Sequence, residues 1–123
     1  MSAAPSDKTA GAAGGQLYVV LSTPGERPED LPRHVPPHID YMVGLEKQGV
    51  LFMAGPFLDA SGKPAPSGMW ILRASSREEA NALAAGDPFH SSGARTFQVE
   101  EWQPHQGRIG VSIDLSDATN NLA

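Results

Sequence analysis

Two short segments of uninterrupted apolar residues, 17–21 and 50–54, constrain the fold of this chain most. Each is the length of a strand and far shorter than the about 20 residues that a membrane-spanning helix needs. A strand that is apolar on both faces requires cover on both faces, so these segments belong inside a layered domain. A third apolar strand is expected at 69–72, and the alternating segment 96–102 predicts a fourth, half-solvated or at a sheet edge.

The segment 38–48 has the spacing of an amphipathic helix. His38, Met42 and Leu45 recur at positions i, i+4 and i+7, so His38 lies on or next to the buried stripe. The two prolines directly before it suit a first helical turn, and the glycine that follows at 49 suits a helix end. A neutral imidazole near the start of this helix can accept a proton, because the helix dipole disfavours the imidazolium there.

A second helix is expected to begin at Ser76 and to end at Gly86. Ser76 and Glu79 form a capping box at its start. The resulting order of strand, helix, strand, strand, helix, strand predicts an α+β fold of the ferredoxin-like βαββαβ type, in which two helices cover one face of an antiparallel four-stranded sheet. Because the other face is apolar too, we expect it to pack against the same face of a second copy in a homodimer.

The folded domain is expected at residues 16–104, with two long loops at 24–32 and 59–68. Residues 1–15 lack an apolar core and are interpreted as a flexible leader rather than a signal peptide, which favours a cytoplasmic location. Residues 105–123 are interpreted as a C-terminal arm or disordered tail. Four apolar residues of this arm alternate with period two and favour an added edge strand, on this subunit or its partner: Ile109, Val111, Ile113 and Leu115.

Composition argues against several classes of function. Nine Lys and Arg residues face fourteen Asp and Glu residues, and the net charge is −5 without a basic cluster. Nucleic acids and anionic membranes are therefore disfavoured partners. The chain has no cysteine, which excludes disulfides, thiolate metal sites and thiol nucleophiles.

Three short motifs lie at consistent spacing between the expected strands: Pro37-His38-Ile39, Ala54-Gly55-Pro56 and Asp87-Pro88-Phe89. With them, residues 16–104 resemble the YciI-like (YCII-related domain) family. The resemblance implies a ferredoxin-like fold that pairs into a dimeric α+β barrel. It also implies that His38 and Asp87 are a catalytic pair, in proteins that tend to act on small ring compounds.

His38 and Asp87 are expected to have different roles in catalysis. If the two helix edges meet, His38 serves as general base and acid, and Asp87 orients its ring and stabilises the charged form. The alternative is a core histidine satisfied by a buried carboxylate. His34 and His38 also have the i, i+4 spacing of a metal pair, but the prolines between them disfavour the helix that such a pair needs, so no metal and no cofactor is expected.

Other residues are candidates for substrate binding. Tyr18, Tyr41 and Phe89 could form aromatic walls, and Tyr41 could also polarise a carbonyl. The backbone of Gly55 and Pro56 permits close approach of a ligand. His90 follows Asp87 closely and either lines the same pocket or lies on the surface.

The reaction that best suits these residues is a cofactor-independent isomerisation or elimination on a small cyclic or aromatic oxygenated metabolite. One alternative is a cofactor-free monooxygenase that acts on a phenol or anthrone. The other is a non-catalytic module that binds a small molecule or serves as a dimeric interaction scaffold.

Overall fold

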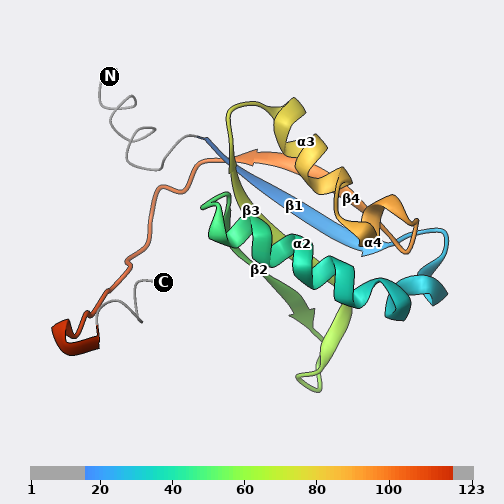
Figure 1. Ribbon diagram of the computed structural model, residues 1–123, viewed down its shortest axis with the longest axis horizontal. Coiled ribbons are helices and arrows are strands. Elements are labelled where there is room, and N and C mark those ends of the chain that lie inside the picture. The colour runs from blue at the N-terminus through green and yellow to red at the C-terminus, as the bar shows by residue number, and fades with distance from the viewer. Residues whose placement is uncertain (1–15, 118–123) are drawn as a thin grey trace.

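The computed structural model describes residues 16–117, so the predicted leader and residues 118–123 lie outside the described part (Figure 1). Four strands, three α-helices and two 3₁₀ helices make up this part of the chain. In chain order they are β1 (Gln16–Pro24), η1 (Pro28–His34), α2 (Val35–Lys47), β2 (Leu51–Leu58), β3 (Pro64–Ala74), α3 (Arg77–Ala85), α4 (Pro88–Ser91), β4 (Arg95–Trp102) and η2 (Leu115–Asp117).

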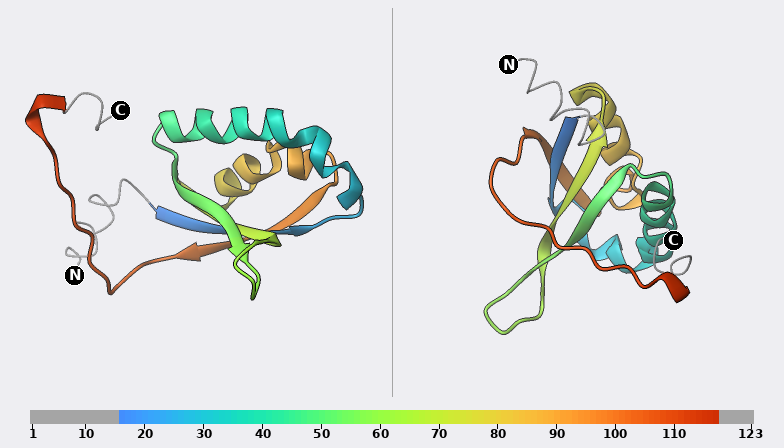
Figure 2. Two further views of the ribbon diagram at one scale, coloured as in Figure 1. Left: turned by 90° about the horizontal axis from the view of Figure 1, so that it is seen from below. Right: turned by 90° about the vertical axis from the view of Figure 1, so that its left-hand side faces the viewer.

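The four strands form one antiparallel sheet in the order β2-β3-β1-β4. Both long helices, α2 and α3, lie on one side of this sheet (Figure 2). The predicted α+β, ferredoxin-like architecture is therefore confirmed. Its central pair, β1 and β3, carries most of the buried residues of the sheet. The apolar segment 50–54, expected inside the domain, lies mainly in the edge strand β2, whose residues are largely exposed.

The core lies between the sheet and the two helices. Along β1, Tyr18 and Val20 point to the helix side, and both are almost completely buried. Leu45 of α2 and Ala80 of α3 pack against them from the helices, together with Leu72 of β3. The expected stripes of both helices thus meet one face of the sheet.

No helix covers the opposite face of the sheet (Figure 2). Val19 and Leu21 alternate with the core residues of β1 and pair in register with Ile71 and Met69 of β3. Side chains from all four residues therefore share the face away from the helices. This is the face for which the sequence predicts a second copy.

Both predicted loops are shorter than expected. Strand β2 continues past Ala54 through Gly55 and Pro56 to Leu58, and β3 begins at Pro64, so only 59–63 remain as a turn. Proline is tolerated in β2 because this strand lies at the sheet edge, where one side of the backbone needs no ladder partner. The carboxylate of Asp59 closes the turn by accepting hydrogen bonds from the backbone N–H groups of Ser61 and Lys63, at 2.8 and 3.1 Å.

The first predicted loop, 24–32, also has to be corrected, because it leads into a 3₁₀ helix that begins at Pro28. Proline suits such a start, since the first N–H groups of a helix have no intrahelical partner. For the same reason α2 begins at Val35, three residues before His38, and takes both following prolines into its first turn.

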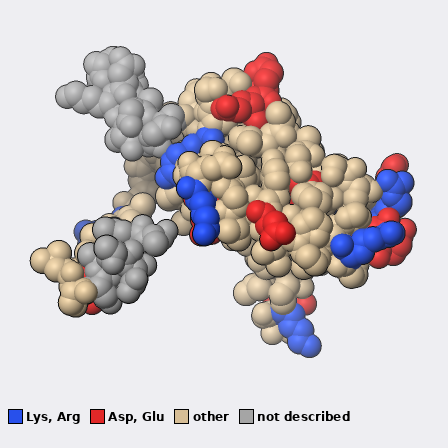
Figure 3. Space-filling model, in the orientation of Figure 1, with Lys and Arg blue, Asp and Glu red and all other residues tan. Residues whose placement is uncertain are grey.

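The described part of the arm does not form the predicted edge strand on its own chain. Residues 103–114 are extended without strand pairing, and their apolar side chains are exposed, as is Leu115 in η2. Pairing with a partner subunit stays a prediction. Within residues 16–117, no helix is long and apolar enough to cross a membrane. On the face shown in Figure 3, basic side chains are dispersed among acidic ones.

Candidate active site

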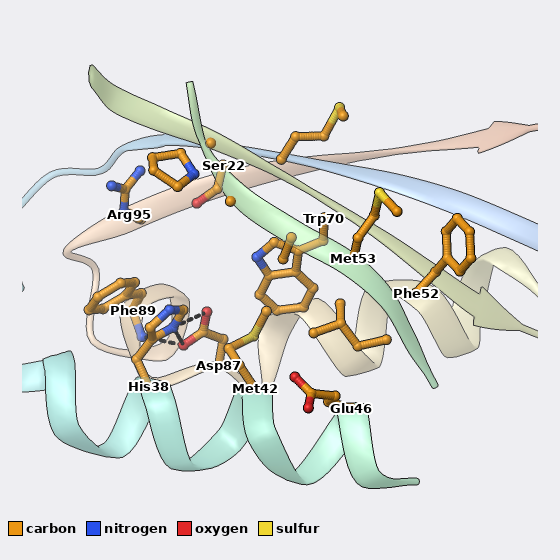
Figure 4. A pocket seen from close by; sticks show the side chains of 16 residues that line it. Ser22, His38, Met42, Glu46, Phe52, Met53, Trp70, Asp87, Phe89 and Arg95 are labelled. Carbon is orange, nitrogen blue, oxygen red and sulfur yellow. Dashed lines mark hydrogen bonds and ion pairs between the residues drawn. The ribbon is translucent and has the colours of Figure 1, made fainter. Parts of the chain in front are cut away.

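A cavity of about 600 Å³ lies between α2 and the sheet, next to the short helix α4 (Figure 4). Its floor follows one row across three strands, because Ser22 of β1 pairs with Gly68 of β3, which pairs with Pro56 of β2. A Cβ atom at Gly68 would lie 2.9 Å from the carbonyl oxygen of Gly55, so glycine permits the close approach of β2 and β3 at this row. The lining residues are Ser22, His38, Met42, Glu46, Leu51, Phe52, Met53, Ala54, Gly55, Pro56, Gly68, Met69, Trp70, Asp87, Phe89 and Arg95.

His38 and Asp87 meet in this cavity (Figure 4). The Nδ1 atom of His38 lies 2.8 and 2.9 Å from the two carboxylate oxygens of Asp87. A carboxylate is an acceptor only, so Nδ1 carries the hydrogen and donates it. In the neutral ring Nε2 is then the basic nitrogen, and it has no hydrogen-bond partner among residues 16–117. This arrangement is that of a general base held by an orienting carboxylate.

Asp87 is held in place by the start of α4. It is the N-cap residue, with extended backbone angles that the following Pro88 favours. Its Oδ1 accepts a hydrogen bond of 3.0 Å from the backbone N–H of Phe89. The side chain is only 1% exposed, so its position does not depend on solvent.

Phe89 fixes the plane of the imidazole. Its ring stacks on His38 with centroids 3.8 Å apart and an angle of 11° between the planes. On the same aromatic ring, the guanidinium of Arg95 lies 5.6 Å from the centroid, which is within the range of a cation–π contact. The imidazole of His38 and the guanidinium of Arg95 therefore share one aromatic neighbour at the cavity.

Tyr41 joins the two helix edges that carry the pair. It lies one turn after His38 in α2, and its hydroxyl donates a hydrogen bond of 2.7 Å to the carbonyl oxygen of Leu83 in α3. Burial raises the pKa of Tyr41, and the nearby Asp87 carboxylate acts in the same direction, so the phenol stays a donor. The contact holds α2 against the turn that leads to Asp87.

Only some of the residues predicted to bind substrate line the cavity. Gly55, Pro56 and Phe89 line the cavity, whereas Tyr18 and Tyr41 do not. Tyr18 is 2% exposed in the core, and its hydroxyl donates a hydrogen bond to the side chain of Gln16. The prediction of Tyr18 and Tyr41 as cavity walls therefore has to be corrected, because both rings pack between sheet and helices.

His90 is more buried than a surface residue, yet it is absent from the cavity wall. It stands behind Ser22, and the Ser22 hydroxyl lies 2.8 Å from its Nε2 atom. Sequence reasoning missed Ser22 and Arg95. The available signal for Ser22 was its place two residues after Val20 on the helix-facing side of β1, as the polar end of an otherwise apolar stripe.

His34 and His38, which have the spacing of a metal pair, both lie at the start of α2. His34 is the last residue of η1 and the N-cap residue of α2, and its side chain makes no capping hydrogen bond. Among residues 16–117, no group of three or more histidine, aspartate or glutamate side chains is arranged to hold a metal ion.

Comparison with known proteins agrees with this architecture. Uncharacterized protein YjpA of Bacillus subtilis (strain 168) is 34% identical over 70 residues, which cover 57% of this chain and 76% of YjpA. A solved structure, 5-chloro-2-hydroxyhydroquinone dehydrochlorinase (TftG) from Burkholderia phenoliruptrix AC1100 in complex with 2,5-dihydroxybenzoquinone, superposes with a TM-score of 0.59. It shares 22% sequence identity, and the match covers 71% of this chain and 93% of that one, which establishes a shared fold.

The family assignment rests on the whole domain. The profile of the YCII-related domain matches residues 16–103, from the first residue of β1 to the residue after β4. The expected resemblance is therefore confirmed, and this chain belongs to the YCII-related domain family.

Proposed function

We propose that this protein is a cofactor-independent enzyme that transfers a proton on a small, oxygenated cyclic or aromatic substrate. The observation that carries the proposal is the contact of 2.8 Å between His38 Nδ1 and the buried Asp87 carboxylate, at the wall of a cavity large enough for one ring. A partly exposed imidazole that is oriented by a buried carboxylate, with an Nε2 atom that has no hydrogen-bond partner in the described part of the chain, is suited to general acid-base catalysis.

The reaction class we favour is elimination. His38 Nε2 takes a proton from the substrate, and the electron pair released by that bond expels the leaving group as its anion. In the related isomerisation, the imidazolium returns the proton to a different carbon. The likeness to a dehydrochlorinase of the same fold supports elimination over isomerisation.

Asp87 acts through His38 rather than on the substrate. Its carboxylate holds the Nδ1–H tautomer and stabilises the imidazolium that forms once Nε2 has taken a proton. Phe89 restricts rotation of the ring, so Nε2 points in one direction. Together these contacts reduce the reorganisation that proton transfer requires.

A chlorinated hydroxyhydroquinone is the first substrate to test, with chloride release and deuterium uptake from D₂O as readouts. Deuterium uptake reports proton transfer whether or not a leaving group departs. We expect His38→Ala to lower both rates by about 10²- to 10⁴-fold. His105→Ala is the matched control, because His105 is exposed and lies outside the sheet and helices. Equal rates in wild type and a folded His38→Ala protein would contradict the proposed role of His38 as the base.

A further inference from the structure

A second polar pair lies across the cavity from His38 and Asp87. Ser22 ends the helix-facing side of β1, lines the cavity and is only 4% exposed. Its hydroxyl oxygen lies 2.8 Å from Nε2 of His90, which belongs to α4. Figure 4 shows Ser22 and Arg95 on the sheet side of the cavity and the His38–Asp87 pair on the helix side.

The orientation of His90 determines which atom donates in this pair. Its Nδ1 atom lies 2.7 Å from the carbonyl oxygen of Ala84, which can only accept, so Nδ1 carries the hydrogen. Burial lowers the pKa of His90, and the ring is therefore neutral, with no hydrogen on Nε2. The hydroxyl of Ser22 must then donate its hydrogen to Nε2.

This direction has a consequence for the cavity. Because the hydroxyl of Ser22 donates its only hydrogen to Nε2 of His90, it presents lone pairs to a ligand and acts purely as an acceptor. Trp70 and Phe97 hold the ring of His90 with centroid distances of 5.7 and 4.7 Å, so the hydroxyl cannot easily turn.

Arg95 places a donor next to this acceptor. Ser22 pairs with Phe97 of β4, and Arg95 stands two residues before Phe97, so it lies on the same face diagonally opposite Ser22. One guanidinium nitrogen donates to the carbonyl of Pro66, and the side chain also lines the cavity. A fixed acceptor and a cationic donor thus stand side by side on the cavity wall.

We propose that Ser22 and Arg95 form a recognition subsite for a ring that carries a hydroxyl group beside an oxyanion or carbonyl oxygen. The ring hydroxyl donates to Ser22, and the neighbouring oxygen accepts from Arg95. His90 is a positioning residue that keeps Ser22 an acceptor. The inference rests on the proposed function in taking this cavity as the substrate site, and it names the substrate class.

The test compares two probes by isothermal titration calorimetry of the full chain at mildly alkaline pH. The first is 4-nitrocatechol as its monoanion, which carries a hydroxyl beside an oxyanion. The second is the 2-fluoro-4-nitrophenolate ion, in which fluorine replaces that hydroxyl and cannot donate. We expect the wild type to bind 4-nitrocatechol about fivefold or more tightly than the fluorinated probe.

The variants assign this preference to individual residues. In Ser22→Ala the affinities for the two probes should become equal. Arg95→Gln should lower both affinities by a similar factor, so that their ratio is kept. Thr23→Ala, at the exposed neighbouring position of β1, should keep the wild-type ratio. His90→Leu should bring the affinity for 4-nitrocatechol closer to that for the fluorinated probe, while the affinity for the fluorinated probe stays unchanged. If His90 had only a structural role, its loss would lower both affinities.

Three results would overturn the inference: a preference that persists in Ser22→Ala, failure of both probes to bind at millimolar concentration, or an Nε2–H tautomer of His90 in ¹⁵N-resolved NMR of the wild type. The NMR measurement needs no variant, so it decides even if His90→Leu does not fold. None of these readouts involves turnover. The subsite can therefore fail while His38-dependent chemistry stands, and the reverse is also true.

Discussion

The hydroxyl of Tyr41 occupies the space in which a side chain at Gly86 would have to lie. A Cβ atom built on Gly86 would be 2.5 Å from the Tyr41 oxygen and 3.1 Å from the ring carbon that bears it. Gly86 directly precedes Asp87, and Tyr41 follows His38 by one helical turn. The close approach of these two residues therefore sets the distance between the members of the proposed catalytic pair.

We expect Gly86→Ala to lower the free energy of unfolding by about 1–3 kcal/mol, the usual cost of overpacking a close contact. Tyr41→Phe added to this variant should recover part of the loss, because it removes the nearest atom. Urea denaturation of the single and double variants measures this coupling. Gly44→Ala is the control, since its Cβ would meet no atom within 4 Å; it should raise stability by about 0.5–1 kcal/mol. Strict additivity of the two substitutions would contradict the proposed contact.

Asp87 offers a way to separate catalysis from stability. Asp87→Asn keeps the shape of the side chain and can still accept from the Phe89 N–H, so the cap should survive with a small change in stability. The amide can, however, donate to Nδ1 of His38, which moves the ring hydrogen to Nε2 and removes the base. We expect a loss of about 10²- to 10⁴-fold in kcat with little change in KM, measured on the substrate identified by chloride release.

Asp87→Ala should behave differently, because it leaves the N–H groups of His38 and Phe89 without their acceptor. We expect this variant to lose about 2–4 kcal/mol of stability in thermal or urea denaturation, more than the asparagine variant. If both variants were equally stable and equally active, the carboxylate would have neither of the roles assigned to it.

The sequence predicts the fold and one half of the site well, for identifiable reasons. Helical spacing places His38 on the inner stripe of α2, and the prolines before it mark the first turn. Asp87 is recognisable as its partner mainly through the family motif, because nothing in the spacing shows that two segments 49 residues apart meet. Ser22 and Arg95 become neighbours only through the register of β1 on β4, which a single sequence does not display.

Tyr18 and Pro56 show why two of the expectations are wrong. The aromatic ring of Tyr18 and its place on β1 favour a position at a cavity wall, and its side chain does point to the helix side. Whether that position meets the cavity or the core depends on where α3 crosses the sheet, and here the ring is buried in the core. Proline likewise suggested that β2 ends at Ala54, although an edge strand tolerates Pro56.

The uncovered face of the sheet leads to a prediction about assembly. Val19 is at its centre, between Ile71 of β3 and Glu100 of β4. We propose that this face joins two copies, and we expect light scattering after size exclusion to show a dimer at micromolar concentration. Val19→Lys should shift the protein to a monomer. Val43→Lys is the matched control, because it makes the same substitution on α2, on the other side of the sheet. Val43 is 40% exposed there. A monomeric wild type would remove the proposed interface.

His90 should make stability depend on pH in a defined window. Burial lowers its pKa, and Arg95 and His38 act in the same direction, while the Ala84 carbonyl and the Asp87 carboxylate oppose the shift. In the unfolded chain the pKa of histidine is about 6.5, so below that pH the unfolded state binds more protons than the folded state. The contribution of His90 to the free energy of unfolding is therefore constant above about pH 6.5 and is lost as the pH falls from there toward its folded pKa.

Urea denaturation of wild type and His90→Gln between about pH 5 and 8 measures this contribution. The wild type should lose stability on acidification below about pH 6.5, and the glutamine variant should show a shallower slope over the same window because it has no titrating ring. His105→Gln is the control, at an exposed position outside the sheet and helices. An identical slope in wild type and His90→Gln would mean that His90 takes up its proton equally well in the folded state.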